Sequence, residues 1–298
     1  MKKLFWTIPI LVLSVLVFSS KALGAKPDFG LLPAEPSDGR AVVAIPERAI
    51  EVTPGVFSLG TAVENGKKVE GYAFVDYRKD FAKPSGCNYD GKCQGWEDSS
   101  CADCAGGNGG TDGDSCYGFL AKGAKWRAVE PYIVNPKNNG GLNEAFVATN
   151  LADDIAKWES AAGTTDIFGD GGSTTETLVA DLDSPDDKNE VYFADIDSAG
   201  AIGVTIVWGI FRGPPSQREL VEWDQVYDDV DFDWSSSGKA GKMDFESIAT
   251  HELGHSVGLD DLYKDACSEQ TMFGFADNGE IKKRNLEAGD IVGVSELY

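Results

Sequence analysis

The chain has two histidines, His251 and His255, and they flank Glu252 in a His-Glu-x-x-His pattern. Side chains four residues apart on an α-helix lie on one face, one turn from each other. Two imidazoles in that arrangement can bind the same zinc ion, and the glutamate beside them can take a proton from a water molecule that the metal acidifies. The pattern therefore predicts a catalytic zinc site in which Glu252 is the general base.

A catalytic zinc site needs a third protein ligand, which here must be an oxygen or a sulfur because the chain has no further histidine. Gly258 stands where a left-handed turn, which costs glycine little, would end the helix and send the chain back toward the metal. Such a turn would deliver Asp260 or Asp261. If a later helix supplied the ligand instead, Glu269 and Glu280 would be the candidates.

The helix that must carry the two histidines is predicted by an apolar stripe at four-residue spacing. Phe245, Ala249, Leu253 and Val257 recur along one face, and Asp244 before them suits an N-cap. The histidines lie on an adjoining face. We therefore expect a helix that begins near residue 244, buries its stripe against a core and presents both imidazoles beside it.

The elements around this helix follow an α+β order. Strand-like runs occupy residues 125–134, 190–196, 202–211 and 220–230, and apolar residues at helical spacing between 147 and 158 predict a helix that Gly163 ends. A final helix is expected from about residue 290. Residues 117–298 are thus predicted to form the catalytic domain.

The segment before residue 117 divides into three parts. Residues 1–25 combine lysines, an apolar run and small residues, which predicts a secretory signal peptide and a secreted, extracellular protein; an uncleaved membrane anchor is the alternative. Residues 26–84 contain short β-type runs and are interpreted as a β-rich region or a propeptide. Residues 85–116 are rich in cysteine, glycine and aspartate and are interpreted as a small module or a linker.

The cysteines are expected to form disulfides, because a secreted chain meets an oxidising environment. The sequence does not choose among the possible pairings of Cys87, Cys93, Cys101, Cys104, Cys116 and Cys267. The first four of these could alternatively form a four-thiolate zinc site. The same segment has carboxylates that could bind a structural calcium ion or belong to a solvated acidic loop, namely Asp90, Asp98, Asp103, Asp112 and Asp114.

The histidine pattern continues as x-x-Gly258-x-x-Asp261, and this extended motif resembles the zinc motif of the metzincin endopeptidases. Most members have a third histidine at the position of Asp261. The aspartate, followed two residues later by Tyr263, is similar to snapalysin, whereas the segments 189–208, 223–234 and 289–298 look more like the matrixin branch. The resemblance favours Asp261 over Asp260 as the third ligand.

The resemblance implies a metzincin-like α+β fold, with a twisted five-stranded mixed sheet, three helices and a methionine turn that Met272 would occupy. It also makes Tyr263 a candidate for stabilising an oxyanion, with plain packing as the alternative, because Phe275 stands where some relatives have a tyrosine beside the metal. A peptide substrate would lie extended along the antiparallel edge strand, for which residues 203–208 are the candidate.

Secreted proteases often carry an inhibitory propeptide, but the N-terminal region lacks the cysteine motif with which matrixin propeptides cap the zinc. The alternative is an accessory module that stays attached to the protease, for which a disulfide between Cys116 and Cys267 would serve.

Acidic residues outnumber basic ones by 49 to 26, which argues against nucleic acid as a partner. The leading hypothesis is a monomeric, secreted zinc endopeptidase that acts on extended peptides or unfolded proteins. The alternative is an exported, calcium-stabilised binding or adhesion protein whose zinc site has little or no hydrolytic activity.

Overall fold

The computed structural model describes residues 41–81 and 116–298, which belong to one structural unit. Several predictions lie outside the described residues: the signal peptide, the four-thiolate site and the calcium ligands, that is, Cys87, Cys93, Cys101, Cys104, Asp90, Asp98, Asp103, Asp112 and Asp114. Within the described ranges, no helix is both long and apolar enough to cross a membrane.

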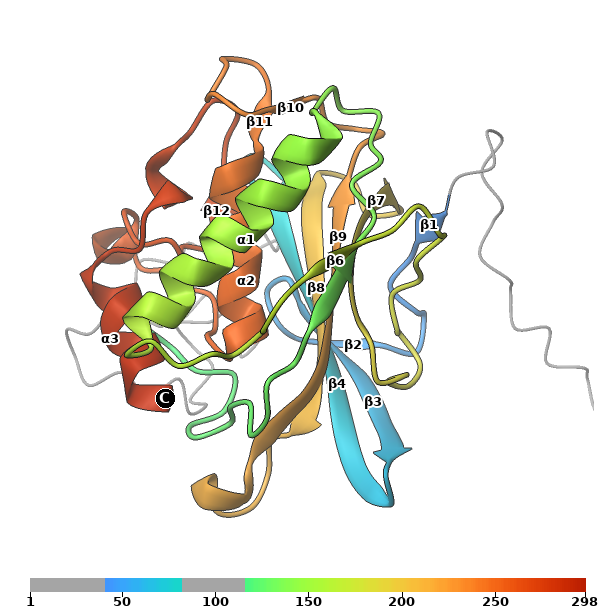
Figure 1. Cartoon of the computed structure of the whole chain (residues 1–298), viewed down its shortest axis with the longest axis vertical. Coiled ribbons are helices and arrows are strands. Elements are labelled where there is room, and N and C mark those ends of the chain that lie inside the picture. Colours follow the sequence, from blue (N-terminus) through green and yellow to red (C-terminus); the bar gives the residue numbers. More distant parts are fainter. Residues whose placement is uncertain (1–40, 82–115) are drawn as a thin grey trace, which may run out of the picture. The chain divides into compact units, whose positions relative to one another are not determined.

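A mixed sheet runs through the described part of the chain (Figure 1). Its main path has the order β2-β3-β4-β8-β9-β7-β5-β6, while β1 pairs with β7 and β12 with β4. The strands are β1 (Val42–Val43), β2 (Ile50–Thr53), β3 (Val56–Glu64), β4 (Lys67–Arg78), β5 (Tyr132–Val134), β6 (Gly172–Ser173), β7 (Asn189–Ile196), β8 (Ala201–Ile210), β9 (Glu219–Asp228) and β12 (Phe275–Ala276).

The strands from β5 to β9 fit the mixed sheet that the resemblance implies. β6, β5, β7 and β9 run parallel to one another in that order, and β8 is antiparallel to β9. The expectation of five strands with a free edge at residues 203–208 is wrong, however, because β4 pairs along the other side of β8 and β2 and β3 extend the sheet further. The sequence indicated β-type runs in this region, but pairing between distant strands leaves no local pattern.

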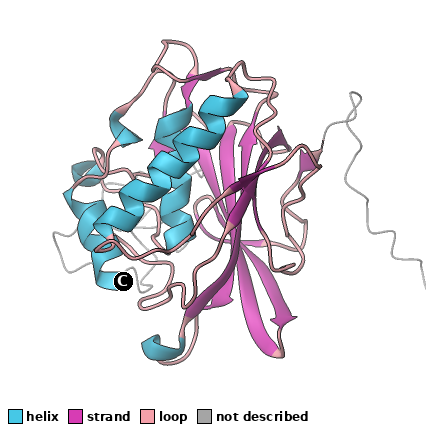
Figure 2. Cartoon of the chain, in the orientation of Figure 1, coloured by secondary structure: helices cyan, strands magenta, loops and turns pink. Residues whose placement is uncertain are grey.

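Helices cover one side of this sheet (Figures 1 and 2). They are α1 (Glu144–Ala161), α2 (Phe245–Val257) and α3 (Ala288–Leu297), with shorter elements β10 (Trp234–Ser235), β11 (Met243–Asp244), η1 (Pro215–Gln217), η2 (Asp265–Cys267) and η3 (Lys282–Arg284). The Asp244 side chain accepts the backbone N–H of Ser247 and so caps α2 as predicted. The strand predicted at 125–134 is shorter than expected, since β5 includes only its last three residues.

The core between helices and sheet is rich in aromatic side chains, and it fixes α2 in place. Trp158, Trp223, Trp234 and Phe245 are among its fully buried members. The indole N–H of Trp158 donates to the carbonyl of Thr250 at 2.9 Å, and Thr250 directly precedes the first histidine on α2. Because a buried tryptophan needs a partner for its N–H, this packing sets the position of α2 along its axis as well as its distance from the sheet.

Cys116 and Cys267 form a disulfide, which is the pairing considered from the sequence as a link between an accessory module and the protease. The bond joins residues 151 positions apart. Cys267 is buried at the end of η2, close to the turn that follows the metal motif.

We expect the double substitution Cys116→Ser/Cys267→Ser to lower the free energy of unfolding by about 3–5 kcal/mol, because the bond closes a long loop in the unfolded chain. Denaturant unfolding monitored by near-UV circular dichroism measures the loss, with Ser268→Ala as the neighbouring control. Equal stability of the double variant and the wild type would contradict the expectation.

Candidate metal centre

The two histidines lie on α2 with both rings buried, 5.0 Å apart between centroids. The Nδ1 of His251 lies 2.8 Å from the carbonyl oxygen of Thr271, and the Nδ1 of His255 lies 3.0 Å from that of Leu259. A carbonyl oxygen can only accept, so the Nδ1 of His255 carries the proton and its Nε2 is left with a lone pair that can bind a metal. The Thr271 carbonyl favours the same tautomer for His251, whose Nδ1 also lies 3.2 Å from the Nζ of the buried Lys283.

Gly258 ends α2 in the left-handed conformation, with φ of +109°. Its N–H and that of Leu259 bind carbonyls of the last helical turn, and the chain then reverses. This reversal brings Asp261 Oδ1 to 3.3 Å from His251 Nε2 and 3.6 Å from His255 Nε2. The three side chains predicted as zinc ligands therefore meet at one point.

The other candidates for the third ligand lie elsewhere. Asp260 is half-buried beside the turn, where its Oδ1 accepts the N–H of Asp261 at 3.0 Å. Glu269 is largely exposed and pairs with Lys282, while Glu280 accepts the N–H of Asp277. None of these three carboxylates belongs to the group formed by the histidines and Asp261.

The polar atoms at this point fit a bound cation. His251 Nε2 and Asp261 Oδ1 are buried and have no hydrogen-bond partner among the described residues, although burying such atoms unpaired is costly. Two imidazole nitrogens and one carboxylate oxygen, with a fourth position left for another ligand, are a donor set that suits zinc. The residues present therefore fit the metal that the sequence predicts.

His255 and Asp261 have the charge states that metal binding requires. Burial lowers the pKa of His255 to about 4, which keeps its ring neutral. Burial would raise the pKa of Asp261, but the neighbouring His255 and His251 outweigh it and bring this pKa to about 2. The third ligand is thus a carboxylate at every pH near neutrality.

Glu252 is fully buried beside the metal ligands. Its Oε2 accepts the hydroxyl of Thr205, on β8, at 2.6 Å, whereas its Oε1 has no hydrogen-bond partner. Burial, with the nearby Asp76 among further causes, raises the pKa of Glu252 to about 8. A carboxylate held by one oxygen and free at the other can accept a proton at the free oxygen and later donate it. Sequence reasoning missed Thr205, because it lies 47 residues away.

Met272 lies directly beneath α2, where a Cβ added to Gly254 would be 2.1 Å from its Sδ. The carboxylate of Asp290 accepts the N–H groups of Thr271 and Met272, at 2.8 and 3.2 Å, and so fixes the turn. Asp290 had been interpreted only as the start of the last helix. The same turn presents the Thr271 carbonyl that orients His251.

The hydroxyl of Tyr263 lies 3.1 Å from Asp261 Oδ2 and 2.9 Å from the carbonyl oxygen of Pro54. The structure thus brings Tyr263 to the third ligand, and its ring packs against Phe275. A hydroxyl engaged in this way orients Asp261. Stabilising an oxyanion, the role expected from the sequence, would require it to leave Pro54.

One further carboxylate at the site comes from the N-terminal region. Asp76, on β4, lies with a ligand atom within 4.8 Å of those of His251 and Glu252. It is 3% exposed, and neither of its oxygens has a hydrogen-bond partner among the described residues. Nothing in the local sequence of β4 pointed to this position.

Residues 217–298 match the matrixin family. The matrixin-like segment contains both histidines, Glu252, Asp261 and Met272, but neither Thr205 nor the N-terminal strands. Metalloendoproteinase 4-MMP of Arabidopsis thaliana is 43% identical over 70 residues, which are 23% of this chain and 18% of that protein. The chain thus matches about a fifth of the length of this curated relative.

Among solved structures, metalloproteinase-II from Bacteroides fragilis aligns with 84% of this chain and 86% of its own, at 13% identity and a TM-score of 0.33. The two sequence matches, to the matrixin family and to the plant metalloendoproteinase, support a matrixin-like metalloprotease region and fit a metzincin-like α+β fold.

We expect Gly258→Ala to weaken zinc binding about tenfold or more, because the left-handed turn delivers Asp261 and an added Cβ would lie 3.0 Å from the carbonyl oxygen of Ala124. Gly213→Ala is the matched control: its φ is +89° and an added Cβ meets nothing within 4 Å. Both variants should lose about 1–2 kcal/mol through backbone strain. Competition with a chromophoric chelator measures the affinity, and equal affinities in the two variants would contradict the role of the turn.

A second group of carboxylates lies at the start of β9 and consists of Asp181, Asp186 and Glu222. Glu222 Oε2 accepts the N–H groups of Asp186 and Asp187, and its Oε1 is buried without a partner. Burial, then the nearby Asp224 and Asp181, raises the pKa of Glu222 to about 9.

This folded-state pKa lies above the ordinary value of 4.5, so between pH 4.5 and 9 the folded chain keeps a proton on Glu222 that the unfolded chain has lost. The free energy of unfolding therefore falls as pH rises toward 9. We expect Glu222→Gln to reduce the fall in unfolding free energy between pH 5 and 9, since the amide oxygen can still accept both N–H groups. Glu219→Gln on the same strand is the control. Equal pH dependence in Glu222→Gln and wild type would show that Glu222 does not carry this proton.

Proposed function

We propose that the chain is a secreted zinc endopeptidase of the metzincin type with an aspartate as its third ligand. The observation that carries the proposal is the meeting of His251, His255 and Asp261 at unpaired ligand atoms, with a free oxygen of Glu252 beside them. The match of this segment to the matrixins supports it independently. Secretion is proposed from the composition of residues 1–25.

In this proposal His251, His255 and Asp261 hold the zinc. When bound, zinc supplies the Lewis acidity that polarises a peptide carbonyl and acidifies a water molecule. Glu252 would accept a proton at Oε1 and pass it to the leaving amine, while Thr205 holds Oε2 and keeps the carboxylate oriented.

The proposed substrate is an extended peptide or an unfolded protein, since a zinc site beside a β-strand suits backbone pairing with the substrate. A binding protein with an inactive zinc site is less well supported. Such a protein has no need of a buried glutamate with one oxygen fixed and the other free at the metal.

We expect Glu252→Gln to lower hydrolysis of an internally quenched peptide about a hundredfold or more while zinc stays bound, because the amide cannot take up the proton. The matched control is Glu246→Gln, on the same helix, whose carboxylate pairs with Lys157 instead. A zinc chelator should abolish hydrolysis by the wild type. If Glu252→Gln hydrolyses the peptide at the wild-type rate, the proposed mechanism is wrong.

A further inference from the structure

We propose that Lys283 is a positioning residue of the metal centre: its buried ammonium faces the ring of His251 and offsets the negative charge that Asp261 brings as the third ligand. This inference rests on the proposed function, because it concerns how strongly the same site holds and activates zinc. Sequence reasoning assigned no role to Lys283.

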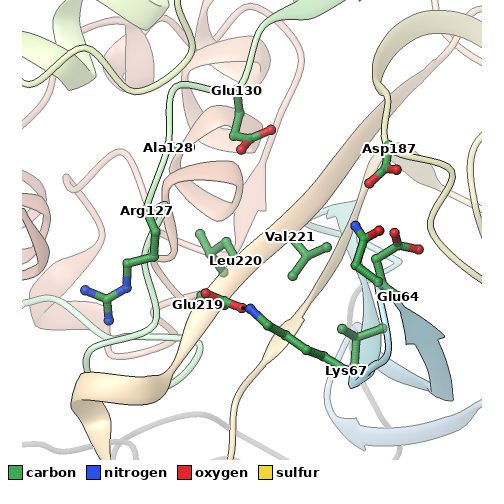
Figure 3. A pocket seen from close by; sticks show the side chains of 11 residues that line it. Glu64, Lys67, Arg127, Ala128, Glu130, Asp187, Glu219, Leu220 and Val221 are labelled. Atoms are coloured by element: carbon green, nitrogen blue, oxygen red, sulfur yellow. Dashed lines mark hydrogen bonds and ion pairs between the residues drawn. The ribbon is translucent and has the colours of Figure 1, made fainter.

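Lys283 differs from an ordinary lysine in being buried without a carboxylate partner. Its exposed fraction is 1%, and it forms no ion pair with a carboxylate of the described residues. Its neighbour Lys282 pairs with Glu269 at the surface, and Lys67 pairs with Glu219 at the rim of a surface pocket (Figure 3). Burying an ammonium is costly, so the groups that Lys283 contacts must offset that cost.

The ammonium of Lys283 contacts two groups of the metal centre. Its Nζ donates to the carbonyl of Phe273, in the turn that contains Met272, and lies 3.2 Å from Nδ1 of His251. Its charge also acts on Asp76, whose oxygens have no hydrogen-bond partner among the described residues. The methionine turn and the first metal ligand thus share one buried cation.

The position of Lys283 is fixed by the residue that follows it. Arg284 donates to both oxygens of Asp244, at 2.9 and 2.6 Å, and its carbonyl accepts from Lys157. Asp244 is the N-cap of α2, the helix that carries the histidines. A two-point pair between guanidinium and carboxylate sets orientation as well as distance. η3 is therefore tied to α2, and Lys283 is held against His251.

The contact between Lys283 and His251 opposes metal binding. An ammonium group can only donate, and His251 binds a metal through Nε2 when its proton is on Nδ1 and donated to the carbonyl of Thr271. In that state two donors face each other across 3.2 Å. If Lys283 donates to Nδ1 instead, the proton must move to Nε2, and the lone pair that would bind the metal is lost. Lys283 and the metal therefore compete for the same ring.

The result is a weaker donor at His251. A carbonyl or carboxylate partner at Nδ1 makes a ligand histidine more basic, and a cation beside Nδ1 has the opposite effect. Asp261 is an anion, so two neutral rings and one carboxylate bring more negative charge to the metal than three histidines would. Lys283 offsets part of that charge, and this keeps a bound zinc ion a stronger Lewis acid.

Substitutions in the full-length chain separate the charge of Lys283 from its hydrogen bond. Lys283→Met removes both, whereas Lys283→Gln removes the charge and keeps a donor for the carbonyl of Phe273. Lys283→Arg keeps the charge. The matched control is Lys282→Met, because Lys282 is the neighbouring lysine of η3 and pairs at the surface.

We expect Lys283→Met and Lys283→Gln to bind zinc about tenfold more tightly than wild type in competition with a chromophoric chelator, because the repelling charge is gone. For the quenched peptide, kcat should fall about tenfold with KM unchanged, since a stronger donor set makes the metal less electrophilic. Lys283→Arg and Lys282→Met should stay within about twofold of the wild-type zinc affinity, because both keep the charge at position 283.

A lysine that only supports the turn predicts the reverse, because zinc affinity would then fall in Lys283→Met and recover in Lys283→Gln. That result would overturn the proposal, and so would equal zinc affinities in wild type and both neutral variants. If Lys283→Met fails to fold, Lys283→Gln decides the question. Zinc affinity is measured without substrate, so tighter zinc binding in a chain that hydrolyses nothing would support the role of Lys283 while refuting the peptidase activity. The two claims therefore fail separately.

Discussion

The metal centre depends on one local constraint, the left-handed turn at Gly258 that ends α2. A helix can place two imidazoles on one face, but it cannot place a third ligand opposite them without reversing. The turn makes that reversal within six residues of His255 and brings Asp261 to both Nε2 atoms. The rest of the site supports this meeting: carbonyls of Thr271 and Leu259 fix the rings, and Tyr263 binds the carboxylate.

The second constraint is long-range and concerns access. β8 supplies Thr205 to Glu252, and Gly203 of the same strand lies close to Glu252 Oε1. β4 pairs along the other side of β8 and adds Asp76 beside His251 and Glu252. The sheet thus lines the candidate metal centre with residues from two strands.

The sequence allowed the metal centre to be predicted because its ligands lie within eleven residues of one another. The spacing of a helix predicted that His251 shares a face with the second histidine. A glycine that can adopt the left-handed conformation predicted that the chain turns back and delivers Asp261. Most helices and strands were also predicted, since their apolar periodicity is local. Asp76, Thr205 and the pairing of β4 with β8 were not, because each joins segments far apart in the chain and depends on sheet topology. The length of the strand at 125–134 was overestimated, because apolar composition alone does not supply a pairing partner.

The central claim is that Asp261 completes the zinc site. It is tested most directly by anomalous diffraction at the zinc edge from crystals of the Glu252→Gln variant. The account predicts one peak, about 2.0–2.2 Å from His251 Nε2, His255 Nε2 and an oxygen of Asp261. A peak bound by the histidines with Asp261 turned away, or no peak at the histidines, would contradict it.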